Sequence, residues 1–132
     1  MEGLAQALEV LFGPVERHAL REDSLQLSFT AQGRPFLLHL ERLQVGGWLY
    51  ALASPVSLPL QDLPLAKEAV DLLGDLELQW TGEGDACVLW AKDLVQTPEE
   101  LLSWIAEEVG WMAGVAEGLE TFSEEGDEPQ GV

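Results

Sequence analysis

Apolar and polar side chains alternate every second residue along much of the first half of the chain, and this pattern restricts the fold more than any other. Residues 24–31 alternate in this way, as a half-buried strand requires. After a turn at Gln32-Gly33 the alternation resumes over residues 36–43, and after Gly46-Gly47 it continues over residues 48–53. The sequence therefore predicts an antiparallel meander of three strands.

Three other segments have the apolar spacing of amphipathic helices. Residues 4–11 predict a short helix that ends at Gly13-Pro14, and residues 62–73 predict a second short helix. Thr97-Pro98-Glu99-Glu100 is a capping box with proline at the first helical position. It predicts the start of a long third helix that runs to Leu119.

The remaining segments complete the expected order of elements. The polar residues 15–23 either extend the first helix or cross to the sheet, and the proline-rich residues 55–64 predict an extended connection. Residues 76–91 predict a second hairpin. The expected fold is a single α+β domain over residues 1–120, ordered α-βββ-α-ββ-α, with an antiparallel sheet packed against helices. The charged residues 121–132 predict a disordered acidic tail.

Charge excludes one class of partner. Six basic and 24 acidic residues give a net charge of −18. Residues 1–66 hold four arginines and seven acids (−3), whereas residues 67–132 hold two lysines and 17 acids (−15). Such a field repels phosphate backbones, so we expect no nucleic-acid partner.

Other features indicate a cytoplasmic protein without a cofactor. No apolar run approaches the roughly 20 residues of a membrane span, and the first residues, with Glu2, lack the basic region of a secretory signal. Cys87 is the single cysteine, which excludes an intrachain disulfide and predicts a buried thiol. The absence of Asn, together with much Leu, Ala, Gly and Glu, favours a GC-rich bacterial origin.

We find no candidate catalytic, cofactor-binding or metal-binding residues. Only His18 and His39 are available as a histidine base, and neither lies in a recognisable nucleophile motif. The acidic runs at residues 82–85 and 124–128 lack the ligand spacing of a helix-loop-helix calcium site. No glycine-rich phosphate loop follows a predicted strand.

The predicted third helix carries the candidate interface. Gly110, Gly114 and Gly118 recur every four residues, and each costs about 1 kcal/mol relative to alanine in a helix. Either these glycines allow close approach of another helix, across a dimer interface for example, or the helix frays or packs tightly within its own domain. The residues that we assign to a partner or dimer interface are Trp104, Ile105, Trp111, Met112, Gly110, Gly114 and Gly118. The tryptophans fill the core or anchor a binding surface.

The order of elements, the size and the acidity of the chain resemble the class I type III secretion chaperones and the related YbjN-like bacterial proteins. The resemblance covers residues 3–119, with minor support from Tyr50-Ala51 before the proline-rich link and from the helix start at Thr97. It implies a homodimer without catalytic residues, which holds an extended segment of a partner protein on apolar patches and sheet edges.

Three hypotheses follow. The first is a non-catalytic, dimeric, chaperone-like module that binds a protein or peptide partner. The second is an acidic regulator that masks a basic surface on a partner. The third is an enzyme with an unrecognised acidic site, which requires a concave pocket with carboxylates of shifted pKa.

Overall fold

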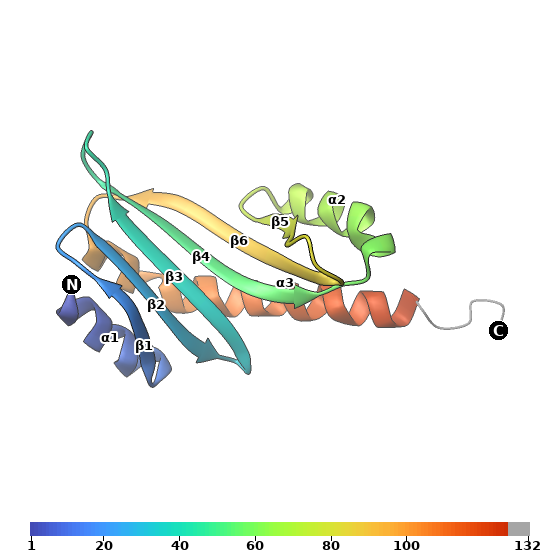
Figure 1. The fold of residues 1–132 in the computed structure, drawn as a ribbon, viewed down its shortest axis with the longest axis horizontal. Helices are drawn as coiled ribbons and strands as arrows, with labels where there is room; N and C mark the ends of the chain where they lie inside the picture. Colours follow the sequence, from blue (N-terminus) through green and yellow to red (C-terminus); the bar gives the residue numbers. More distant parts are fainter. Residues whose placement is uncertain (127–132) are drawn as a thin grey trace.

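The computed structural model describes residues 1–126, and the side chains of residues 1–121 (Figure 1). In this part of the chain the elements are, in order, α1 (Glu2–Phe12), β1 (Val15–Leu20), β2 (Ser24–Ala31), β3 (Arg34–Arg42), β4 (Trp48–Ser57), the 3₁₀ helix η1 (Leu60–Asp62), α2 (Leu63–Leu73), β5 (Glu77–Trp80), β6 (Ala86–Val95), the 3₁₀ helix η2 (Pro98–Ser103) and α3 (Ile105–Gly126).

All six strands form one antiparallel sheet in the order β1-β2-β3-β4-β6-β5. The predicted α+β class and the antiparallel sheet packed against helices are confirmed. Strand β1 resolves the segment that the sequence left open, because it crosses to the sheet and pairs with β2. The register shifts between Arg17 and Ala19, so His18 lies at a bulge in this polar edge strand.

Strand β4 is longer than expected and continues through Pro55 to Ser57. Its pairing with β3 ends at Ala53, whereas its pairing with β6 extends to Ser57. The carbonyl of Pro55 points toward the β3 side, where it accepts a hydrogen bond from Arg34. A backbone N–H at this position would point to the same side, where β3 no longer pairs with β4, so proline costs no ladder hydrogen bond here.

One face of the sheet is covered by helices and the other is open. In Figure 1, α3 passes behind the sheet, and no helix of the described residues lies in front of β2 to β4. The residues that α3 buries are Ile105, Val109, Met112, Ala113, Ala116 and Leu119, and α1 joins the same core through Leu4, Ala5 and Leu8. On the open face, Ala51 and Ala53 are buried outside this core. The predicted burial of the Cys87 thiol is confirmed.

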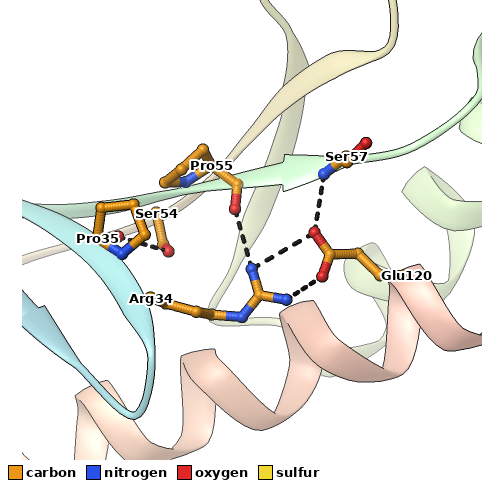
Figure 2. A network of polar contacts seen from close by, with 6 residues as sticks. All are labelled: Arg34, Pro35, Ser54, Pro55, Ser57 and Glu120. Carbon is orange, nitrogen blue, oxygen red and sulfur yellow. Dashed lines mark hydrogen bonds and ion pairs between the residues drawn. The ribbon is translucent and has the colours of Figure 1, made fainter.

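A network of polar contacts around one ion pair connects α3 to residues 54–57 of β4, which no longer pair with β3 (Figure 2). Arg34, at the start of β3, pairs with Glu120 of α3 and also donates to the Pro55 carbonyl at 3.2 Å. The Glu120 carboxylate accepts the backbone N–H of Ser57 at 2.9 Å. The hydroxyl of Ser54, which is fully buried, donates to the Pro35 carbonyl at 2.9 Å. Hydrogen bonds made by side chains thus replace the backbone hydrogen bonds between β3 and β4 where these two strands separate.

The predicted cap by Thr97 is confirmed, although Glu100 bonds to the residue before the cap and not to Thr97 itself, and the segment that follows is different from the predicted one. The Thr97 hydroxyl accepts the N–H of Glu100 at 3.3 Å, and the Glu100 carboxylate accepts the N–H of Gln96 at 2.8 Å. The element that follows is the 3₁₀ helix η2, and α3 begins only after a break at Trp104, where φ is −139° and ψ is −4°. The prediction of one continuous helix from Thr97 is therefore wrong.

Helix α3 also extends further than predicted, to Gly126. Residues 121–126 are therefore helical, although we expected them to belong to a disordered tail. Adding residues to a helix that already exists costs much less than nucleating one, so a polar segment can continue it. The rest of the predicted tail, residues 127–132, lies outside the described residues. None of the described helices combines the length and the apolar character needed to cross a bilayer.

The ion pair of Arg34 and Glu120 predicts a difference between two glutamates. Glu120→Ala removes the carboxylate that accepts from the Ser57 N–H and from the partly buried Arg34 guanidinium, so we expect the free energy of unfolding to fall by about 1–3 kcal/mol. The control is Glu9→Ala, whose carboxylate pairs with Arg17 at 2.6 Å in a more exposed position. This loss should stay below about 1 kcal/mol. Urea unfolding measures both variants, and equal losses would contradict the structural role of Glu120.

Candidate functional site

A depression of about 640 Å³ opens between the start of α3, the strands β4 and β6, and the loop from α2 to β5. We call it the acidic pocket. It is lined by Tyr50, Gly74, Asp75, Lys92, Asp93, Trp104, Glu107, Glu108 and Trp111. Four of these side chains are carboxylates and three are aromatic, so the pocket combines negative charge with flat apolar walls.

The break between η2 and α3 positions the aromatic walls. At this break the Trp104 ring contacts the Tyr50 ring, with 4.9 Å between the ring centroids and 56° between the planes. Trp111 follows two helical turns later, and 37% of its surface is exposed. Tyr50 comes from the core-facing side of β4, so side chains far apart in the sequence meet here.

The hydroxyl of Tyr50 is an unused polar group at this site. The residue is 4% exposed, and its described contacts include no hydrogen bond. No fully enclosed side-chain oxygen lacks a partner in the described part of the chain, so this hydroxyl opens onto the pocket. Burial and the nearby Glu108, Asp93 and Asp75 raise the pKa of Tyr50. The phenol therefore stays neutral at physiological pH and retains both its donor and its acceptor capacity.

The carboxylates of the pocket have no basic partner. The ion pairs found among the described residues do not include Asp75, Asp93, Glu107 or Glu108. The amino group of Lys92 lies over the Trp90 ring, 5.2 Å from its centroid. Burial, followed by the negative charges of Asp75 and Asp93, raises the pKa of Glu108. Asp75 and Asp93 thus act on Glu108, and none of these three acids has a basic partner among the described residues.

The edge of β6 beside the pocket is unpaired. Strand β5 covers only Cys87 to Trp90, so β6 continues to Val95 without a neighbour on that side. The Leu94 N–H bonds instead to the carboxylate of Asp93, at 2.8 Å. This N–H therefore points away from β4. We call residues 91–95 the β6 edge.

A second depression adjoins this edge on the open face of the sheet. It measures about 350 Å³, and its lining includes Trp90 and Glu77. It shares Gly74, Asp75 and Lys92 with the acidic pocket. The two depressions thus flank the β6 edge, one on each side.

The structure divides the predicted interface residues into three groups. Trp104 and Trp111 line the acidic pocket. Ile105 and Met112 are completely buried against the sheet, so they belong to the core of the chain itself and offer no surface to a partner. This corrects the assignment of these two residues to a partner or dimer interface. Trp104 and Ile105 are consecutive, as are Trp111 and Met112, and the two pairs lie seven residues apart. Only the tryptophan of each pair reaches the surface.

The side of α3 that carries Gly110, Gly114 and Gly118 is mostly exposed to solvent. A Cβ atom on Gly114 or Gly118 would meet nothing within 4 Å, and one on Gly110 would lie 3.2 Å from the side-chain nitrogen of Gln32. Tight packing within the domain therefore does not explain Gly114 and Gly118, whereas Gly110 lies close to the Gln32 side chain.

The sequence reasoning did not identify Tyr50, Asp75, Asp93 or Glu108. The available signal was Tyr50 itself, a residue with a polar end at a core-facing position of a predicted strand. No local signal marks the acids, because their convergence depends on long-range pairing.

The geometry of the described residues supports neither a metal site nor a catalytic triad at His18. Within residues 1–121 no group of three or more His, Cys, Asp or Glu side chains is placed to hold a metal ion. The Nε2 atom of His18 lies 2.7 Å from the Ser28 hydroxyl on the open face. No carboxylate among the described side chains hydrogen-bonds this imidazole, so the orienting group of a catalytic triad is missing.

Comparisons with protein-family models, with curated proteins and with solved structures found no match to this chain.

The raised pKa of Glu108 predicts that this residue destabilises the fold when ionised. Because the folded state binds the proton more tightly, stability falls as the pH rises from the unfolded pKa through the folded pKa. Glu108→Gln should therefore raise the melting temperature at neutral pH, and this gain should disappear in acid. Glu107→Gln, one position earlier in the same helical turn, is the control and should change stability by less than about 0.5 kcal/mol. A Glu108→Gln variant that is less stable than the wild type at pH 7 would contradict the uncompensated charge.

The exposed glycines generate a second prediction. Gly114→Ala and Gly118→Ala should each raise the free energy of unfolding by about 0.5–1 kcal/mol, because alanine favours the helix and its methyl group meets open space. Gly110→Ala should gain less, since its methyl group would press on Gln32. Light scattering should give both variants the mass of the wild type. Dissociation of an assembly by either alanine would instead assign this face to an interface between copies.

Proposed function

We propose that this protein is a non-catalytic protein-binding module that holds an extended segment of a partner protein along the β6 edge. The observation that carries the proposal is the unpaired stretch of β6 beyond Trp90, with a depression on each side of it. Unpaired backbone groups at a sheet edge are a template for an added strand.

Strand addition supplies affinity and specificity through different groups. Backbone hydrogen bonds to β6 would hold any extended segment, whereas the side chains of that segment would alternate between the two depressions. The Leu94 N–H is available for such pairing once the Asp93 carboxylate rotates away. Since Asp93 already occupies this N–H, it also protects the edge from unspecific pairing in the free protein.

The resemblance to class I type III secretion chaperones and YbjN-like proteins supports the same proposal. It implies a chaperone-like role, a homodimer and a cytoplasmic location, and we include all three in the proposal. The open face of the sheet and the β6 edge are the kinds of surface on which such a protein holds its partner.

An acidic regulator that masks a basic surface is the second candidate function. The observation that favours it is the set of pocket carboxylates without a basic partner. The two candidates differ in the force that binds the partner. Contacts between surface charges weaken strongly with salt, whereas backbone pairing and apolar contacts do not.

Two substitutions at one position test strand addition. Leu94→Pro removes the outward N–H and blocks pairing at the β6 edge, whereas Leu94→Ala keeps the N–H and removes only an exposed side chain. We expect the Ala variant to capture the same partners from a bacterial lysate as the wild type, and the Pro variant to lose them. Captured proteins are identified at low and at high salt, and melting curves confirm that both variants are folded.

The outcomes separate the two candidates. Binding that survives high salt but not Leu94→Pro supports strand addition. Loss at high salt together with full retention by a folded Leu94→Pro variant would refute strand addition and favour the acidic regulator.

A further inference from the structure

We propose that the acidic pocket binds one basic side chain of the partner segment, and that arginine is the residue it fits best. The identity of the ligand as part of a partner segment rests on the proposed function, but the binding of the basic group rests on the pocket alone.

The charge of the pocket selects a cation. Carboxylates from three parts of the fold line it: Asp75 from the α2–β5 loop, Asp93 from β6, and Glu107 and Glu108 from α3. The one basic group that lines the pocket, Lys92, contacts Trp90. Phosphate and carboxylate ligands are excluded by repulsion, whereas a cation relieves the repulsion among these acids.

The start of a helix explains only part of this cluster. Acids in a first helical turn interact favourably with the helix dipole, and this accounts for the position of Glu107 and Glu108, although burial and nearby charges outweigh this interaction for ionised Glu108. It does not account for Asp75 and Asp93, which belong to other elements. Nor does it account for Tyr50, a buried residue whose hydroxyl opens onto the pocket without a hydrogen-bond partner.

The aromatic walls and the size favour a guanidinium over a metal ion. No three acids within the described side chains converge closely enough to hold a metal, whereas a space of about 640 Å³ accepts an organic group. The rings of Trp104 and Trp111 offer faces on which a planar cation stacks. A guanidinium carries five N–H donors, which suits the carboxylates together with the Tyr50 oxygen as acceptors.

The β6 edge brings such a side chain within reach. Residues that lie opposite each other on neighbouring strands project to the same face of the sheet. Asp93 lines the acidic pocket from β6, so the residue of an added strand that pairs opposite Asp93 also directs its side chain there. Its neighbours in the segment would face Trp90 on the open side.

The test uses a small probe, so that it does not depend on strand addition. Nα-acetyl-arginine amide is titrated into the ¹⁵N-labelled full-length protein, and the tryptophan indole N–H signals are followed by NMR. We expect saturable shifts of the Trp104 and Trp111 signals and none of Trp80, which is exposed outside the pocket. The matched probe, Nα-acetyl-citrulline amide, has nearly the same shape without the charge and should bind at least about tenfold more weakly.

Two conservative variants identify the groups responsible. Glu108→Gln and Tyr50→Phe should each weaken the arginine probe by about tenfold, the first through lost charge and the second through a lost acceptor. Glu83→Gln, in the turn from β5 to β6, is outside the pocket and should leave binding unchanged. Unchanged folding of each variant is checked from its amide spectrum.

Each outcome decides a separate question. Equal binding of arginine and citrulline probes, or arginine binding that both variants retain in full, would overturn the pocket proposal. Binding of the free probe together with capture that Leu94→Pro does not affect would keep the cation site and refute strand addition. Saturation by a lysine probe that is tighter than arginine would overturn the choice of guanidinium.

Discussion

The packing of α3 across one face of the sheet is the constraint on which the other features depend. Its buried side chains meet the core-facing residues of the strands, and α1 packs on the same side. The opposite face is therefore left without a helix in the described part of the chain. The pair of Arg34 and Glu120 fixes the far end of α3 against β4, where the ladder between β3 and β4 has ended. The near end is fixed by the contact of Trp104 with Tyr50. The acidic pocket forms at this near end because β5 has 4 residues and β6 has 10, so part of the sheet edge stays uncovered.

Local sequence patterns predicted most of the fold, and the errors share a physical cause. Two-residue alternation identified strands β2 and β3 and their buried faces, because those faces pack on the core. Strand β1 was left undecided because an edge strand with exposed side chains has no such alternation. The extension of β4 through Pro55 depends on Arg34 and Glu120, which lie far away in the sequence. The break at Trp104 was not predicted, because a capping box indicates only where a helical segment starts. It does not indicate where that segment changes from a 3₁₀ helix to an α-helix.

The candidate site was less predictable than the fold, since it is made by convergence of distant segments. Helical spacing brings Trp104, which lies just before α3, and Trp111 of α3 to one pocket, but the same spacing applies to Ile105 and Met112, which are core residues. Only the position of the sheet relative to the helix distinguishes the two pairs. The pocket acids resemble ordinary surface acids in the sequence, because nothing local indicates that the α2–β5 loop faces the start of α3.

The cluster of unpaired carboxylates connects stability with binding. Holding like charges together in a partly buried site opposes folding, and the raised pKa of Glu108 has the direction that this opposition requires. The apolar core must offset this cost in the free protein. A cation that enters the pocket is attracted by the carboxylates and also reduces the repulsion among them. Part of its binding free energy therefore comes from removing a repulsion that destabilises the free protein. A pocket lined by neutral polar groups would lack this second contribution. Ionised Glu108 therefore makes the free protein less stable, and the same carboxylates favour occupation by a basic group, because none of them has a basic partner among the described residues of the chain itself.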